Sequence, residues 1–508
     1  MKSFKNKKTN LAKYMVLLLS CFALITVDSG CKKALDAQVY SEISPSNFYK
    51  TEADINAAVI TIYSPFSSNW DQTDLGDNDQ YASLYNADIK TYLLKSIMTT
   101  DEAGTDWDEN LTNFTFGPAT YQGLGNSVYP YISYVAKATD VIANINNVTS
   151  VSTDVKNKYI AETKVLRAWL MFVLYDFYGP VNAETDPTKL ASLTIAPRPT
   201  ADAYSAQIES DLTSAIPDLP AKYNSDATNW GRMSQGVANM LLLKLYMMNK
   251  QWDKAQAVAT TIMGMGYSLM PNYADVFNVK QNNELIYAVP TNSASPNYWV
   301  QEALPGDFAS GATSAGVLTR GPGWGGYYMP WAFYAKFEAG DTRKNTIIAS
   351  YTTSSGTTAN QASGLRGAIP LKYTGAVGQG QGPGYSLDVV VFRYADVLLS
   401  LAEAINEQTG PTDAYQYVNQ VRARAGVAPF APGMTTDQFR AALLDERGRE
   451  LYCEGVRRQD LIRNGSLISN AIARGKTSAQ SYMTLFPIPS NVMIQGNGVI
   501  KQNLGYSQ

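Results

Sequence analysis

The chain has 508 residues, of which 45% are hydrophobic and 17% charged, a composition that suits a globular protein with a large core. It contains no histidine, which excludes Ser-His-Asp and Cys-His nucleophilic sites, histidine metal sites and the usual general base near neutral pH. The formal net charge is −3, and because five lysines lie within residues 1–30, the rest of the chain is more acidic. An acidic body does not attract a phosphate backbone, so nucleic acid is not expected as a partner.

Residues 1–30 have the pattern of a signal peptide. Lysines precede an apolar run over residues 14–27 that is too short to span a bilayer stably. Cys21 and Cys31 are both candidates for lipidation, and the sequence LLS before Cys21 is the better lipobox. Cys453 is the third cysteine, so no disulfide or thiolate metal cluster is expected in the body of the chain. Residues 31–39 are predicted to be a tether, and residues 40–508 a single body.

Amphipathic helices are predicted in two blocks of this body. A first helix is expected within residues 44–66, capped by Ser46 or Asn47, before the periodicity fades over residues 67–125. The first block, residues 129–266, contains YISYVAKATDVIANI, YIAETKVLRAWLMFVLYDFYG, residues 200–219 and two helices joined at residues 249–251. The second block, residues 389–465, contains three helices that begin near residues 389, 413 and 436.

A nine-residue spacing recurs in both blocks. It separates Tyr246 from Ala255 and Ile405 from Ala414. In tetratricopeptide units a small residue on the second helix lets it pack closely against the first. Strict 34-residue repetition is missing, so divergent helical hairpins embedded in one body are predicted.

The last predicted helix, running to Arg463, is rich in charges of alternating sign. Its charged residues fit either a solvated face with weak ion pairs or a partly buried network. Arg393, Asp396 and Glu403 lie in otherwise apolar segments and need partners, so we predict that these three are buried.

Long motifs near the C-terminus resemble the signature of the SusD/RagB family. They are FRYADVLLSLAEAINE, VNQVRARAG, ERGRELYCEGVRRQDLIRNG, FPIPSNVM and KQNLGY, and the pair Glu162 and Arg167 matches the family's AE-x-x-x-LRA pattern. The resemblance implies a mostly α, SusD-like fold, in which tetratricopeptide-like hairpins form a scaffold and a loop-rich region with little strand binds the ligand. It also implies a surface-exposed outer-membrane lipoprotein that binds nutrients, usually glycans, beside a SusC-like TonB-dependent transporter. Residues from Cys31, CKKALD, resemble the mature start of such proteins and favour Cys31 as the lipidated residue.

Two loop-rich stretches, residues 67–125 and 290–388, carry aromatic residues beside polar ones. A glycan offers C–H faces that stack on rings and hydroxyls that pair with polar side chains. No cofactor, metal or catalytic residue is predicted. The predicted ligand-binding residues are Asp106, Trp107, Asn110, Tyr298, Trp299, Arg320, Trp324 and Tyr327.

Two other functions stay open on the sequence. A glycoside hydrolase needs paired carboxylates and no histidine, although no separate motif marks an acid and a nucleophile. A peptide-binding tetratricopeptide scaffold would use a concave helical groove, whereas the aromatic residues here are concentrated in loops.

Overall fold

The computed structural model describes residues 48–68, 83–118, 128–313, 315–319, 322–375 and 384–507. Contacts divide the chain into residues 1–50 and a large unit, Thr51–Gln508, which is the body described below. The predicted signal peptide, the tether, Cys21, Cys31 and the proposed caps Ser46 and Asn47 all lie outside the described residues. The first described helix of the body is α3 (Glu52–Ile60), which is capped by the Thr51 side chain.

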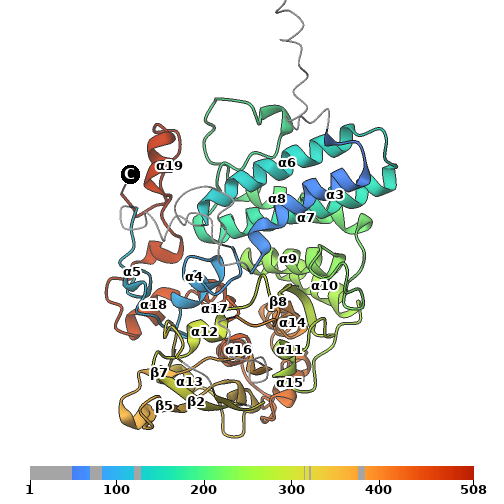
Figure 1. Ribbon diagram of the computed structural model, residues 1–508. Helices are drawn as coiled ribbons and strands as arrows, with labels where there is room; N and C mark the ends of the chain where they lie inside the picture. The colour runs from blue at the N-terminus through green and yellow to red at the C-terminus, as the bar shows by residue number, and fades with distance from the viewer. Residues whose placement is uncertain are drawn as a thin grey trace, which may run out of the picture. The chain divides into compact units, whose positions relative to one another are not determined.

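A series of packed helices forms the scaffold. Each contacts the next, first α6 (Ile132–Asn147), α7 (Thr153–Tyr178), α8 (Ala201–Ala215), α9 (Gln235–Met248) and α10 (Trp252–Met263). The series continues from α10 to α14 (Tyr394–Thr409), which packs against α15 (Tyr415–Arg424) and α16 (Thr436–Leu451). Figure 1 shows α6, α7 and α8 beside α3, with α14 and α16 lower in the view. The predicted mostly α scaffold of helical hairpins is confirmed.

Small residues lie where the helices of each hairpin meet, as the nine-residue spacing predicts. Ala255 on α10 and Ala414, just before α15, are both fully buried. The link between α9 and α10 covers residues 249–251, also as predicted. Trp169 on α7 is fully buried, and its ring stacks on that of Phe392 at a centroid distance of 4.8 Å.

The strands are short, and one of them corrects a predicted helix. Residues 389–393 form β8 (Val389–Arg393), which pairs antiparallel with β1 (Leu285–Val289). The three valines of VVVFR are β-branched and the whole run is buried, which favours a strand once a partner is available.

The stretch 290–388 holds more regular structure than the sequence indicates. A four-stranded sheet has the order β3-β2-β5-β6, and a pair joins β4 to β7. The strands are β2 (Phe308–Thr313), β3 (Gly316–Thr319), β4 (Met329–Pro330), β5 (Ser350–Thr353), β6 (Thr358–Asn360) and β7 (Gly367–Ala368). Short helices outside the scaffold are α4 (Tyr92–Met98), α5 (Glu109–Thr112), α11 (Asp275–Asn278), α12 (Trp299–Ala303), α13 (Trp331–Tyr334), α17 (Arg457–Arg463), α18 (Leu467–Ala473) and α19 (Ser490–Gln495).

The prediction of one continuous helix to Arg463 is wrong, because the chain breaks between α16 and α17. Cys453 and Gly455 adopt left-handed conformations with φ of 55° and 74°. A residue in that conformation cannot continue a right-handed helix. The break turns the charges of α17 onto a different set of partners from those of α16.

Burial of the charge network is confirmed. Arg393 is 1% exposed and donates to Glu454 at 2.7 Å and to Glu284 at 2.9 Å. Asp396 accepts from Arg447 at 2.9 Å, and Glu403 accepts from Arg463 at 2.6 Å. These ion pairs join the residue before β1 to β8, and they join α14, α16 and α17 to one another.

Candidate functional site

A glycine-rich loop, residues 322–328, is held against α12 by main-chain hydrogen bonds. The N–H groups of Trp324, Gly325 and Gly326 donate hydrogen bonds to the carbonyl oxygens of residues 301, 304 and 302, respectively, each at an N···O distance of 2.8 Å. A β-carbon at Gly326 would lie 2.6 Å from the Trp107 ring, so only glycine lets that ring lie on the loop. The loop is therefore positioned by its backbone.

Three rings form an open aromatic surface on this loop and its neighbours. Trp324 is 45% exposed and Trp107 is 41% exposed. The half-buried Tyr298 lies nearly parallel to Trp324, with an interplanar angle of 15° and ring centroids 6.1 Å apart. We call Trp107, Tyr298 and Trp324 the ring platform. Partly exposed aromatic rings are the kind of surface on which the C–H face of a sugar stacks.

Two other predicted residues are buried, which contradicts their placement on an exposed surface. Trp299 is 3% exposed and donates from its indole nitrogen to the carbonyl oxygen of Pro370 at 2.7 Å. Tyr327 is 2% exposed and donates from its hydroxyl to the carbonyl oxygen of Ala87 at 2.6 Å. Because their polar atoms find partners inside the protein, burial costs these rings little. The Tyr327 ring lies between those of Trp107 and Trp299, at centroid distances of 5.5 and 5.8 Å, and so supports the platform from beneath.

Polar side chains flank the platform. Asp106 is exposed and forms an ion pair with Arg366, whose guanidinium lies 4.2 Å from the centre of the Tyr328 ring. Asn110 is exposed and accepts from the Thr115 hydroxyl at 2.9 Å. The predicted residue Arg320 lies outside the described residues. Arg366 is not among the residues predicted from the sequence, because nothing in the segment GLRG indicates that it lies close to residues 106 and 328.

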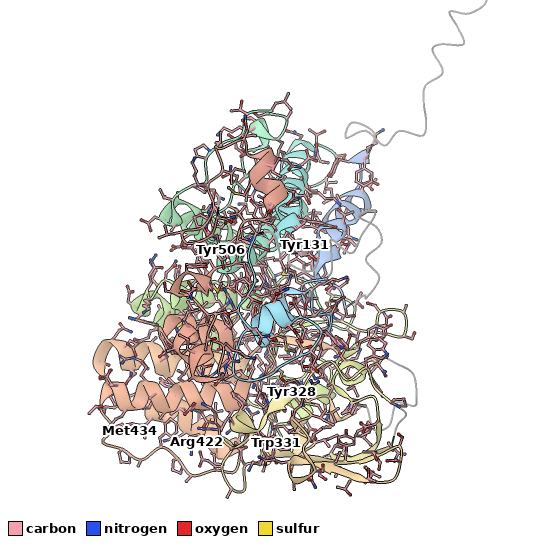
Figure 2. The ribbon with its side chains drawn as sticks, turned by 90° about the vertical axis from the view of Figure 1, so that its left-hand side faces the viewer. Tyr131, Tyr328, Trp331, Arg422, Met434 and Tyr506 are labelled. Carbon is pink, nitrogen blue, oxygen red and sulfur yellow. The ribbon has the colours of Figure 1, made fainter. Side chains whose placement is uncertain are left out.

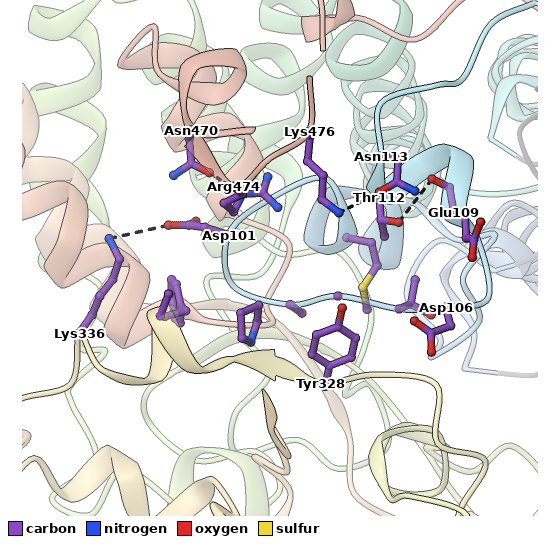
Figure 3. A pocket seen from close by; sticks show the side chains of 17 residues that line it. Asp101, Asp106, Glu109, Thr112, Asn113, Tyr328, Lys336, Asn470, Arg474 and Lys476 are labelled. Atoms are coloured by element: carbon purple, nitrogen blue, oxygen red, sulfur yellow. Dashed lines mark hydrogen bonds and ion pairs between the residues drawn. The ribbon is translucent and has the colours of Figure 1, made fainter. Parts of the chain in front are cut away.

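A cavity of about 540 Å³ opens next to Asp106 and Tyr328 (Figure 3). Its wall includes residues from α4, α5 and α13 and from the segment after α18. In Figure 2, Tyr328 and Trp331 lie toward the bottom of the view, whereas Tyr131 and Tyr506 lie toward the top. Residue 104 pairs with residue 328 in an isolated β-bridge, which places the cavity directly beside the loop that carries the platform.

A buried carboxyl group lies beneath the platform. Glu302 on α12 is fully buried, and neither carboxyl oxygen has a hydrogen-bond partner among the described residues. Desolvation, followed by the charge of Asp88, raises the pKa of Glu302 to about 9. The carboxyl group is thus protonated at neutral pH, and its burial keeps it out of reach of a ligand on the platform.

Two kinds of feature are absent from the described residues. In the ranges given above, no group of three or more acidic or cysteine side chains is arranged to hold a metal ion. A search of the same ranges finds no helix with the length and hydropathy needed to cross a membrane.

The fold is shared with solved SusD-like proteins. A surface glycan-binding protein A from Bacteroides thetaiotaomicron, in complex with laminarihexaose, superposes with a TM-score of 0.69 at 22% identity, covering 89% of this chain and 99% of that one. By sequence, SusD-like protein P25 of Formosa agariphila is 26% identical over 91% of each chain. The starch-binding protein SusD of Bacteroides thetaiotaomicron is 37% identical over 126 residues, which are 23% of this chain and 22% of that protein.

Two family models together span nearly the whole chain. The model described as the SusD family matches residues 248–506, and the model described as "Starch-binding associating with outer membrane" matches residues 35–247. The chain belongs to the SusD family, which confirms the resemblance seen in its C-terminal motifs.

Proposed function

We propose that this protein is a surface-exposed lipoprotein of the outer membrane that binds an oligosaccharide or polysaccharide. The observation that carries the proposal is the ring platform, in which two tryptophans are more than two-fifths exposed and a tyrosine lies parallel to one of them. Exposed indole rings are costly in water, and a sugar that covers them recovers part of that cost. Asp106, Asn110 and Arg366 are placed near enough to offer hydrogen bonds to hydroxyl groups of the same ligand.

The names of relatives support a glycan as the ligand. One similar structure was solved with laminarihexaose bound, and one relative is a starch-binding protein. Here we propose the same class of ligand, a chain of sugar rings, and a partnership with a SusC-like TonB-dependent transporter that takes up the captured glycan. The membrane anchor in this proposal is Cys31, after removal of residues 1–30. Mass spectrometry of the mature N-terminal peptide would identify acylated Cys31, and acylated Cys21 would contradict it.

The proposal is tested with the soluble fragment that lacks residues 1–31. A glycan array identifies a ligand, and isothermal titration calorimetry then measures its affinity for Trp107→Ala and Trp324→Ala. Each substitution removes one stacking face and is expected to weaken binding by about tenfold or more. Trp324→Phe, which keeps a ring, should lose less. Leu193→Ala is the matched surface control, since Leu193 is 98% exposed and is not part of the platform.

The same experiment separates binding from catalysis. A binding protein retains the glycan unchanged, whereas a glycoside hydrolase shortens it, as chromatography of the incubated glycan would reveal. Unchanged affinity in both tryptophan variants would remove the platform from the site. Release of shorter sugars would overturn the proposal that the protein binds the glycan without cleaving it.

A further inference from the structure

The cavity beside the ring platform is lined by six charged side chains, and three of them, Asp101, Asp106 and Lys336, are already in ion pairs. Both carboxylate oxygens of Asp101 accept from Arg457, at 2.8 and 2.9 Å. Lys336 donates to Asp445, on α16, at 2.7 Å, and Asp106 is paired with Arg366. These groups offer little net charge to a ligand, because each already has a counterion.

The other three are the exposed Glu109 and two cations, Arg474 and Lys476, and the described residues show no ion pair for any of them. Arg474 donates to the amide oxygen of Asn470 at 2.9 Å and to the carbonyl oxygen of Thr99 at 3.3 Å. Lys476 donates to the amide oxygen of Asn113 at 2.8 Å. All of these acceptors are neutral, and among the described residues neither cation forms an ion pair with a carboxylate. Both side chains are half-buried and line the cavity.

Partial burial destabilises the charged forms of both side chains, and the charge of Asp101 opposes this effect on the pKa of Arg474. Burial lowers the pKa of Arg474, and burial followed by the charge of Arg474 lowers the pKa of Lys476. Two like charges near each other in a partly desolvated wall are stabilised when an anion enters between them. Figure 3 shows Arg474 and Lys476 across the cavity from Tyr328, with the carboxylates Asp106 and Glu109 to one side.

We infer that the cavity binds an anionic substituent of the glycan, a carboxylate or a sulfate ester, through Arg474 and Lys476. The inference rests on the proposed function, because the sugar chain would run from the ring platform past Asp106 and Tyr328 into the cavity. The volume of about 540 Å³ lies within the range of sites that enclose small ligands. The platform then supplies affinity for sugar rings of any charge, and the cavity selects chains that carry an acidic group.

The test compares ligands that differ in charge alone, using the full mature protein. Oligogalacturonide is paired with its methyl ester, and sulfated laminarin oligosaccharide with laminarihexaose, so the two pairs distinguish a carboxylate from a sulfate ester. The wild type should bind at least one anionic member about tenfold more tightly than its neutral counterpart, with an affinity that falls as salt rises. Arg474→Gln with Lys476→Gln should abolish this preference and leave binding of the neutral member unchanged.

Further measurements keep the two proposals separate. Galacturonic acid and inorganic sulfate are each titrated into the wild type, and binding is monitored by changes in its NMR signals. These small anions probe the cavity without the platform. Binding of either anion that is lost in the double variant supports the inference even if no oligosaccharide is retained. If the double variant fails to fold, Lys476→Gln, at a half-exposed position, replaces it. Equal affinity for charged and neutral partners, or no response to either small anion, overturns the anionic site while glycan binding through Trp107 and Trp324 stands.

Discussion

Removal of Glu454 tests how much the buried charge network stabilises the scaffold. Its side chain is 3% exposed and accepts from Arg393 at 2.7 and 2.8 Å and from the ammonium of Lys372, which is 1% exposed. In Glu454→Ala, Arg393 keeps its ion pairs with Glu284 and Glu450. Lys372 is left with aromatic rings alone, of which the nearest is that of Tyr452, with its centre 4.2 Å from the ammonium nitrogen. Loss of one partner from a buried ion pair costs about 3–5 kcal/mol. Urea denaturation followed by circular dichroism should measure that decrease in the free energy of unfolding.

The control lies on helix α16, in the same network region. Asp445 is 47% exposed in its pair with Lys336, so Asp445→Ala should cost under about 1 kcal/mol. Adding Lys372→Met to Glu454→Ala removes the stranded ammonium and should restore part of the lost stability. A melting temperature within one degree of the wild type in Glu454→Ala, or no recovery in the double variant, would refute the reasoning.

Two further predictions concern the region beneath the ring platform. The raised pKa of Glu302, about 9 against a usual 4.5, means that the folded state binds its proton more tightly than the unfolded state. The resulting stabilisation is fully present below about pH 4.5 and is lost as the pH rises toward 9. In Glu302→Gln, the free energy of unfolding should therefore fall by a few kcal/mol less over this pH range than it does in the wild type. The same pH dependence in both proteins, measured by urea denaturation, would contradict the burial of the carboxyl group. Gly326→Ala should displace the Trp107 ring and weaken glycan binding severalfold, whereas Gly306→Ala, where an added β-carbon meets nothing within 4 Å, should leave the calorimetric affinity unchanged.

Long helices with clear periodicity were predictable from sequence, and their interruptions were not. The hairpins α9–α10 and α14–α15 follow from apolar spacing and small residues at fixed intervals. The strand β8 was mistaken for the start of α14 because a fully apolar run has no period of its own, and its partner β1 lies about a hundred residues earlier. The break after α16 includes Cys453 in a left-handed conformation, which the presence of a cysteine does not predict.

The ring platform was predictable in kind but not residue by residue. The sequence marks Tyr298 and Trp299 equally, yet Trp299 donates to the carbonyl oxygen of Pro370 and is buried, whereas Tyr298 is half-buried. The same holds for Trp324 and Tyr327, since the hydroxyl of Tyr327 reaches the carbonyl oxygen of residue 87. Burial here is decided by contacts between distant segments, and a local pattern of aromatic residues carries no record of them. For the same reason Arg474 and Lys476 gave no signal before the fold brought them beside Tyr328.

The attachment of the glycine-rich loop to α12 through main-chain atoms has an evolutionary consequence. Because the peptide groups of residues 324–326 supply the anchoring, a codon change at Trp324 alters the displayed ring and leaves the support in place. The neighbouring glycines have no such freedom, since Gly326 is fixed by the ring that rests on it. Single mutations at Trp324 can therefore change the displayed side chain while the main-chain support of the loop is kept, so long as Gly326 is inherited unchanged.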